Sequence, residues 1–333
     1  MIGTEDSIFY NNTMPILDST FKPAWWLKNP HMQTLWSTFF KNLPEVNSSD
    51  FRVELKDGDF IDLVITELSE KPIVLIMHGL EGSLSSHYVK PLIKLLDDEG
   101  YGVVFMHFRG CSDEVNRTDR SYHSGDTGDL EAVIEAIKNQ FQQNIFAVIG
   151  FSLGGNILLK WLGENGRNAK TKTAIAVSVP FQLSHAGDRL EKSFSRIYQK
   201  HLISRCQQKY QEKFSARKSP LNVEINQLNT FFAFDDQVTA PLHGFSGADE
   251  YYEKCSSRQF LKTIEKPTLV IHAKDDPFMW EHTVPEESEL SEYVHLELSQ
   301  NGGHVGFISG KSPFHAEYWV DQRIIKWLNK QRG

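Results

Sequence analysis

The sequence contains little cysteine, no excess of positive charge and no long apolar run. Its three cysteines, Cys111, Cys206 and Cys255, are too few and too scattered for a disulfide framework or a thiolate zinc site. Lys and Arg number 35 against 43 Asp and Glu, which gives a formal charge of −8. A nucleic-acid partner is therefore not expected, because binding phosphates requires a concentrated basic surface.

Signals for export or membrane insertion are also missing. The apolar runs at 73–77 and 102–106 have five residues each, and no run approaches the roughly 20 that a membrane helix needs. The chain does not open on a basic stretch followed by an apolar one, as a signal peptide would. We expect a soluble, cytoplasmic protein with no transmembrane segment. The sequence leaves peripheral membrane contact open without supporting it, and it does not indicate an oligomeric state.

Apolar runs alternate with helical patterns through the first half of the chain. A hairpin signal at Asp57-Gly58 comes first. The predicted strands then lie at 73–79, 102–108, 144–150 and 173–180, and the predicted helices at 88–100, 129–141 and 152–166. Strands that are apolar on both faces, separated by helices, indicate an α/β protein with a mostly parallel central sheet flanked by helices.

The alternation breaks off at residue 181 and returns near residue 263. The intervening segment is polar and helical in places, and strand patterns resume at 267–276 and 294–299 before a last helix at 316–330. We expect an N-terminal arm at 1–50, a core made of 51–180 and 263–333, and a mostly helical cap inserted at 181–262. Insertions at strand ends commonly cover active sites.

The strongest local motif is Gly150-Phe151-Ser152-Leu153-Gly154, which follows a predicted strand and precedes a predicted helix. In that context Gly-x-Ser-x-Gly indicates a nucleophile elbow, in which a tight turn exposes the serine hydroxyl above the sheet. The glycines remove side chains that would collide at the turn, and the helix N-terminus favours a developing anion. Ser152 is therefore the predicted nucleophile.

A serine nucleophile needs a base and a carboxylate to orient it. His304 lies in a glycine-rich loop after the strand at 294–299, where an α/β-hydrolase fold carries its base. Asp276 ends the preceding strand segment, so the order Ser152, Asp276, His304 fits that fold. Asp275 remains an alternative acid, and Asp235 and Asp236 are weaker candidates. His272, within a strand pattern, is expected to be a packed core residue.

Two backbone N–H groups are expected to form an oxyanion hole. One belongs to Leu153, directly after the nucleophile, and the other to Leu80, in the His78-Gly79 turn after the strand at 73–79. His78 would hold this turn rather than catalyse. No metal or other cofactor is expected, because the chain has neither a zinc-ligand spacing nor a dinucleotide-binding glycine motif.

Further motifs accompany the serine and histidine segments: FKP (21–23), NPHMQT (29–34), HGLEGS (78–83), HFRGCS (107–112) and YHSG (122–125). Together they resemble the YheT-like esterases, which belong to the AB-hydrolase-4 group of the α/β-hydrolase superfamily. The resemblance covers about 21–330. It implies an α/β-hydrolase fold and a serine hydrolase acting on carboxylic esters, but it supplies no physiological substrate.

We therefore expect a serine esterase that cleaves short- to medium-chain acyl esters through an acyl-enzyme. An acyltransferase or thioesterase would use the same triad and differ only in what intercepts the acyl-enzyme. A hydrolase fold used only for binding is a further alternative, although such proteins usually lose a triad member.

Four segments allow two interpretations each. Arg109 and His123 either bind a substrate carboxylate or pin their loop, and pinning is favoured. Cys111 is expected to be a buried, inert thiol rather than a reactive one. Residues 189–218, with nine Lys or Arg and two Glu, form either a membrane-surface helix or, preferably, a lid helix with a solvated basic face. The aromatic segment 21–40 either lines the acyl pocket or, preferably, packs on the core.

Overall fold

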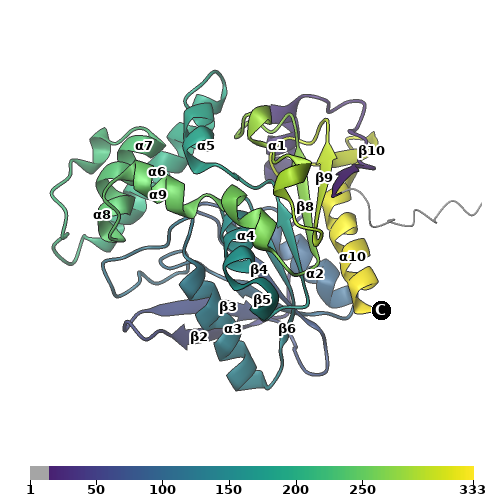
Figure 1. Cartoon of the computed structure of the whole chain (residues 1–333), viewed down its shortest axis with the longest axis horizontal. Coiled ribbons are helices and arrows are strands. Elements are labelled where there is room, and N and C mark those ends of the chain that lie inside the picture. Colours follow the sequence, from purple (N-terminus) through teal and green to yellow (C-terminus); the bar gives the residue numbers. More distant parts are fainter. Residues whose placement is uncertain (1–14) are drawn as a thin grey trace, which may run out of the picture.

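The computed structural model describes residues 15–333, and part of the predicted N-terminal arm, 1–14, lies outside the described residues. A nine-stranded sheet runs through the centre, in the order β1-β9-β8-β7-β6-β4-β5-β3-β2 (Figure 1). Its strands are β1 (Ile16–Asp18), β2 (Ser49–Glu54), β3 (Phe60–Ile65), β4 (Ile73–Met77), β5 (Gly102–Met106), β6 (Ile145–Phe151), β7 (Thr173–Val177), β8 (Thr268–Ala273) and β9 (Val294–Ser299).

The sheet is mostly parallel, as the strand–helix alternation predicts. The seven neighbouring strands β1, β9, β8, β7, β6, β4 and β5 are parallel to one another. By contrast, β3 pairs antiparallel with both β5 and β2. The β2–β3 pair is the hairpin expected around Asp57-Gly58, and Gly58 adopts a positive φ of 82° at its turn. A second sheet consists of β10 (Ile308–Ser312) and β11 (His315–Tyr318).

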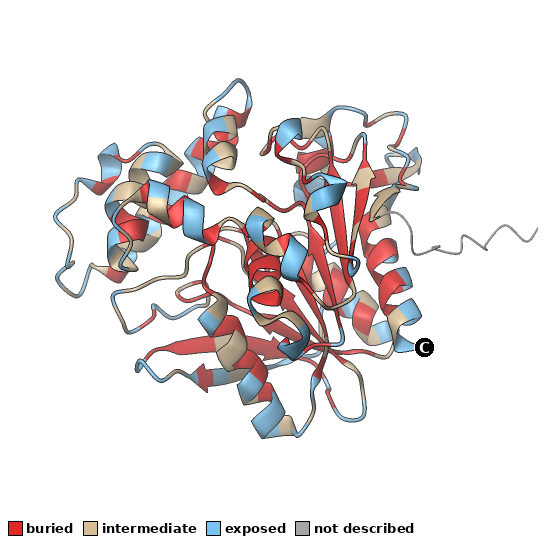
Figure 2. Cartoon of the chain, viewed as in Figure 1, coloured by how far each residue is buried: buried red, intermediate tan, exposed pale blue. Residues whose placement is uncertain are grey.

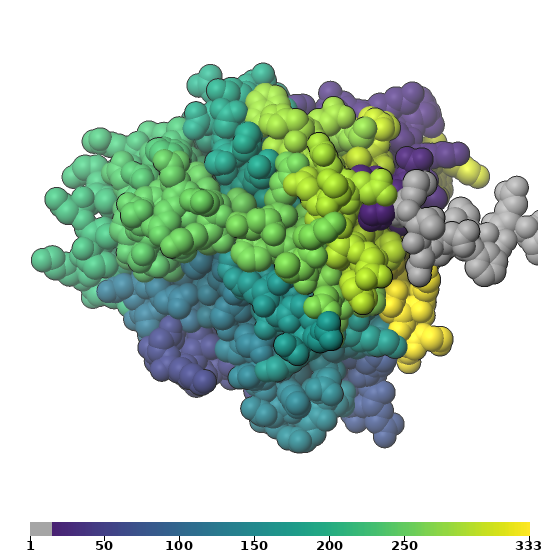
Figure 3. All heavy atoms as spheres, viewed as in Figure 1, coloured from purple at the N-terminus to yellow at the C-terminus, as the bar shows by residue number. Residues whose placement is uncertain are grey.

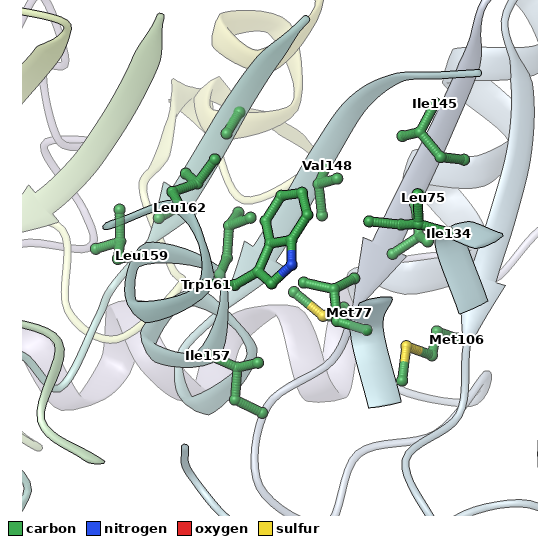
Figure 4. Close-up of a cluster of buried hydrophobic side chains, with 14 of the residues drawn as sticks. Leu75, Met77, Met106, Ile134, Ile145, Val148, Ile157, Leu159, Trp161 and Leu162 are labelled. Carbon is green, nitrogen blue, oxygen red and sulfur yellow. The ribbon is translucent and has the colours of Figure 1, made fainter. Parts of the chain in front are cut away.

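Helices cover both faces of the sheet and bury β4 completely. Alternate residues of a strand point to opposite faces. Thus Leu75 and Met77 pack in one core cluster with α3 (Thr127–Phe141) and α4 (Leu153–Asn165), where Trp161 is the largest fully buried side chain (Figure 4). Val74 and Ile76 pack on the other face with α2 (Val89–Asp98) and α10 (Trp319–Arg332). Figure 2 shows the strands buried between these helices.

The segment between β7 and β8 is mainly helical and lies beside the sheet, drawn in teal and green in Figures 1 and 3. It contains α5 (Leu183–Leu190), α6 (Ser195–Lys213), α7 (Phe231–Phe234), α8 (Ala240–Leu242) and α9 (Ala248–Cys255), with a π turn at Asp235–Thr239. Small apolar clusters of its own hold it together, one of them formed by Ile225, Leu228 and Val238.

Three features differ from the expected elements. The last helix begins at Trp319, because 316–318 belong to β11 and not to the helix. The short strand β1 adds a parallel edge beside β9, and α1 (Pro30–Phe40) forms within the N-terminal segment. Asn29 caps α1, since its side chain accepts hydrogen bonds from the backbone of His31 and Met32. Within 15–333, no helix has the length and apolar character required to cross a membrane.

Four of the parallel strands end at the same edge of the sheet. The loops that follow β4, β6, β8 and β9 carry Leu80, Ser152, Asp276 and His304 in turn. The carboxyl edge of a parallel sheet is where α/β proteins commonly bind ligands. The fold therefore gathers the predicted site residues from distant parts of the chain.

Candidate active site

Ser152 occupies a strained turn between β6 and α4. Its φ of 51° and ψ of −117° lie in a region that residues other than glycine rarely adopt. Its backbone N–H donates to the carbonyl oxygen of Val177 at 2.8 Å, which anchors the turn to the neighbouring strand. A Cβ on Gly150 would lie 2.4 Å from the carbonyl oxygen of Gly154. The turn thus requires the small residues that the motif supplies.

His304 reaches Ser152 from the loop after β9. Its Nε2 lies 3.0 Å from Ser152 Oγ, and its Nδ1 lies 2.8 Å from Asp276 Oδ2. The backbone N–H of His304 donates to Thr34 Oγ1 at 2.9 Å, so helix α1 helps to fix the loop. The structure therefore brings the three residues of the predicted triad into one continuous chain of hydrogen-bonding contacts.

The two adjacent aspartates in the β8 loop have different partners. Asp276 is buried, and its second oxygen accepts a hydrogen bond from the backbone N–H of Phe278 at 2.8 Å. Asp275 instead accepts from the backbone N–H of Gly303 at 3.0 Å and from Asn301 Nδ2 at 3.2 Å. Asp276 thus contacts the imidazole, whereas Asp275 holds the loop that carries it.

Asp235 and Asp236, the weaker candidates for the acid, lie in the cap segment. Asp235 accepts hydrogen bonds from Thr239 Oγ1 and Tyr252 OH, and burial raises its pKa to about 6. Asp236 accepts from the backbone N–H of Ala248. Both carboxylates are engaged within the cap and not with His304.

Three contacts around His304 and its loop could not be predicted from sequence patterns. The ring of Phe278 stacks on the imidazole, with centroids 4.0 Å apart and planes 3° from parallel. Ser178 Oγ accepts from the backbone N–H of Val305 at 3.0 Å. With Thr34, these residues restrict the imidazole and its loop. Their positions depend on chain segments that meet only in the folded protein.

The two predicted oxyanion donors lie next to Ser152. Leu80 and Leu153 line the same cavity as the serine, and Leu153 is the first residue of α4. The turn after β4 passes so close that a Cβ on Gly79 would lie 3.2 Å from Ser152 Cβ. The N–H of Gly79 itself donates to Tyr88 OH at 2.9 Å.

His78 is buried beneath this turn. Its Nε2 accepts a hydrogen bond from the backbone N–H of Phe108 at 3.1 Å, and its Nδ1 lies 2.6 Å from the carbonyl oxygen of Gly79. Burial lowers the pKa of His78 to about 3, so the imidazole is neutral at physiological pH. These contacts place it as a support for the turn, away from Ser152.

The cap contacts the Leu80 turn through an ion pair. Glu81 has a positive φ of 53° and is buried. Its carboxylate lies 3.2 Å from Lys209 Nζ on α6 and accepts a hydrogen bond from Tyr122 OH at 2.7 Å. Tyr122 OH in turn accepts from the backbone N–H of Glu81. The turn after β4 is therefore held by the cap as well as by the core.

A cavity of about 190 Å³ opens from Ser152 between the sheet edge and the cap. Leu183 and Leu190 of α5, Leu202 of α6 and Phe231 of α7 give it apolar walls. Lys209 and Lys213 of α6 also face it. Lys213 is buried and donates to the carbonyl oxygen of Arg120. The basic side chains of α6 therefore do not all form a solvated face, contrary to the sequence expectation.

The remaining predicted residues have structural partners. Arg109 is buried and pairs with Asp129, Asp57 and Asp59, which pins its loop as expected. His123 lies against His243 and near Cys255 Sγ. Cys111 is buried, and burial raises its pKa to about 11, consistent with an inert thiol.

His272 is buried in β8, as expected for a core residue. Burial lowers its pKa to about 4. Within 15–333, no group of three or more His, Cys, Asp or Glu side chains is placed to hold a metal ion.

Comparison with known proteins places the chain among esterases and other hydrolases. The family model for the alpha/beta hydrolase fold matches residues 72–311. The chain is 39% identical to "Putative esterase YheT" of Escherichia coli (strain K12), over 92% of each chain. It is 28% identical to "Phospholipase ABHD3" of Mus musculus, over 98% of this chain and 82% of the relative.

Solved structures agree on the fold. The esterase Pf2001 of Pyrococcus furiosus superposes with a TM-score of 0.59 at 19% identity, covering 88% of this chain and 98% of the other. The predicted fold class is therefore confirmed, and the sequence relatives support hydrolase activity. The chain belongs to the α/β-hydrolase fold family and, within it, to the YheT-like esterases of the AB-hydrolase-4 group.

Proposed function

We propose that the protein is a serine esterase that cleaves short- to medium-chain carboxylic esters through an acyl-enzyme. The observation that carries this proposal is the chain of contacts from Asp276 through His304 to Ser152, with distances of 2.8 and 3.0 Å. A serine hydroxyl is a weak nucleophile on its own, and a neighbouring imidazole held by a carboxylate is the arrangement that activates it.

In the first half of the proposed reaction, Ser152 Oγ attacks the ester carbonyl carbon while His304 Nε2 takes its proton. Asp276 holds the Nδ1 proton and stabilises the imidazolium that forms. The tetrahedral oxyanion accepts hydrogen bonds from the backbone N–H groups of Leu80 and Leu153. His304 then gives the proton to the departing alcohol, which leaves an acyl-enzyme.

In the second half, water replaces the alcohol. His304 removes a proton from the water as it attacks the acyl carbon, and a second tetrahedral intermediate forms in the same oxyanion hole. Collapse of this intermediate breaks the bond to Ser152 Oγ, which recovers its proton from His304. The acid product then leaves, and no further group is required for the cycle to close.

The cavity supports an acyl chain as the group that is bound. Its walls from α5, α6 and α7 are largely apolar and begin at Ser152, and burial of an alkyl chain there contributes about 0.8 kcal/mol per methylene. Relatives named as a phospholipase and a monoacylglycerol lipase support an ester substrate.

The direct test is hydrolysis of p-nitrophenyl esters from acetate to palmitate by the wild type and Ser152→Ala. We expect an optimum at short or medium chain length and a loss of kcat of at least about 10⁴-fold in the variant. Ser204→Ala, on the exposed side of α6, is the matched control and should retain wild-type kcat. Equal rates for Ser152→Ala and the wild type would contradict the proposal.

A further inference from the structure

Helix α1 is amphipathic, but its polar face is buried and aromatic side chains are exposed. Its buried residues are Gln33, Thr34 and Ser37, all polar, whereas Phe39 and Phe40 are 70% and 63% exposed. A surface helix ordinarily turns its apolar stripe to the core and its polar face to water. The sequence expectation that the aromatic side chains of 21–40 pack on the core is therefore wrong for this face of α1.

The polar face is buried because it holds other segments in place. Gln33 Nε2 donates to the carbonyl oxygens of Leu27 and Ile308 at 2.7 and 3.0 Å, and Gln33 Oε1 accepts from the N–H of Ile308 at 2.6 Å. Thr34 Oγ1 accepts from the N–H of His304. These bonds fix the rotation of α1 about its axis. The outward direction of its aromatic residues follows from them.

The exposed residues extend beyond α1. Trp25 is 72% exposed and Phe314, at the turn between β10 and β11, is 93% exposed. Trp25 Nε1 donates to the carbonyl oxygen of Lys311 at 3.0 Å, which ties these two segments together. Figure 1 shows α1 and β10 at the same end of the molecule. We call Trp25, Phe39, Phe40 and Phe314 the aromatic surface, and the exposed Met32 lies on the same helix as Phe39 and Phe40.

The charge around the aromatic surface is opposite in sign to that of the whole chain. Residues 21–44 contain three lysines, Lys22, Lys28 and Lys41, and no Asp or Glu, although the chain has a net charge of −8. Lys41 pairs with Asp321. Lys22 and Lys28 are exposed and have no ion pair among the described residues. The surface thus combines exposed aromatic rings with uncompensated positive charge.

A series of ring contacts connects this end of the molecule to the candidate active site. His31, near the start of α1, contacts Phe194 of the cap, with ring centroids 4.5 Å apart, and lies within hydrogen-bonding distance of Tyr198 OH. The Tyr198 ring contacts Phe278 at 4.9 Å, and Phe278 stacks on His304. Phe194 is itself partly exposed. The N-terminal end of α1 is therefore linked by ring contacts to His304.

We propose that the aromatic surface docks on an anionic phospholipid bilayer. Aromatic side chains insert at the boundary between headgroups and acyl chains, and nearby lysines are attracted to anionic headgroups. A second copy of the chain fits less well, because a two-fold dimer would set the same lysine-bearing surface against itself. Docking here would bring to the lipid surface helix α1, whose His31 begins the ring contacts that reach His304. The inference does not depend on the proposed esterase activity.

The test is co-flotation of the full chain with vesicles of phosphatidylcholine alone or of phosphatidylcholine with phosphatidylglycerol. We expect the wild type to float with the anionic vesicles and to be released by added salt. The double variant Phe39→Ser/Phe40→Ser should bind at least about tenfold more weakly. Lys22→Gln/Lys28→Gln should lose the preference for phosphatidylglycerol.

Tyr293→Ser is the matched control, because Tyr293 is also an exposed aromatic residue but lies at the amino end of β9, whereas α1 contacts the loop that follows the carboxyl end of this strand. It should float as the wild type does. Circular dichroism and size-exclusion chromatography establish that each variant is folded. Absence of wild-type binding, or equal binding by the Phe39→Ser/Phe40→Ser variant, would overturn the proposal. So would a wild-type dimer that the same double variant dissociates.

Discussion

At the scale of single residues, the candidate site depends on two neighbouring carboxylates with separate tasks. Asp276 contacts the imidazole of His304, while Asp275 binds the backbone of the glycine-rich loop. Their adjacency in the sequence left the choice between them open. Burial and hydrogen bonding distinguish them, because Asp276 is the buried carboxylate and the one in contact with His304 Nδ1.

We predict that Asp276→Asn lowers kcat by about 10³- to 10⁴-fold, because an amide favours the wrong imidazole tautomer and cannot stabilise the imidazolium. Asp275→Asn is the control and should retain most of the activity, since an amide oxygen can still accept from the N–H of Gly303. Steady-state kinetics on the best p-nitrophenyl ester checks both. A larger loss in Asp275→Asn than in Asp276→Asn would reverse the assignment.

A second residue-scale prediction concerns His272, whose pKa burial lowers to about 4 from an ordinary value of 6.5. Between about pH 4 and pH 6.5, the unfolded chain therefore binds a proton at this residue, whereas the folded protein does not. The stability contributed by neutral His272 is complete above about pH 6.5 and is lost as the pH falls towards 4. His272→Gln removes this dependence.

Urea unfolding of both proteins across this pH range measures the effect. His272→Gln is expected to be less stable at neutral pH, because its side chain packs less well in β8. The gap between the two free energies of unfolding should narrow as the pH falls from 6.5 to about 4. A constant gap would show that His272 is not held neutral in the folded protein.

At the scale of elements, helix α6 does more than cover the cavity. Lys209 extends from it to Glu81, next to Leu80 in the turn that carries a proposed oxyanion donor. A buried carboxylate whose partner is removed is costly, so the turn is expected to move when the pair is broken. The cap and the proposed oxyanion hole are in this way coupled by one ion pair.

We predict that Lys209→Met lowers kcat about tenfold or more, which corresponds to about 1.4 kcal/mol of lost transition-state stabilisation. KM should change less, because the walls of the cavity remain in place. Lys200→Met, on the exposed side of the same helix, is the matched control and should leave both constants unchanged. A change confined to KM would mean that Lys209 only shapes the cavity.

The elements that the sequence predicts well are those with local signals. The buried strands β4 and β5 and the helices α3 and α4 follow from runs of apolar residues and from helical spacing. The Ser152 turn follows from its glycines and from its place between β6 and α4. The order of Ser152, Asp276 and His304 reflects the same strand-by-strand pattern, so the candidate triad could be named before any contact was known.

The elements that the sequence does not predict depend on distant partners. Strand β1 has three residues and exists because β9 offers an edge. Helix α1 buries its polar face because Gln33 and Thr34 bind segments about 270 residues away in the sequence. The sequence pattern predicts that Lys209 and Lys213 are solvated, and only the position of α6 turns them inward.

At the scale of the whole molecule, a rigid sheet carries the chemistry and two added parts surround it. The cap supplies the walls of the cavity and the Lys209 contact, and α1 supports the His304 loop from the other side. Figure 3 shows the cap in green and the N-terminal segment in purple on opposite sides of the upper part of the molecule. The site is thus assembled from three regions around one sheet edge.

The central claim is that Ser152 is an activated nucleophile, and labelling with a fluorophosphonate tests it most directly because the result does not depend on the substrate. Intact-mass and peptide analysis of the wild type should show a single adduct, on the peptide that contains Ser152. Ser152→Ala should remain unlabelled, and His304→Ala should label far more slowly. A folded wild-type protein that forms no adduct, or forms one on another residue, would contradict the account.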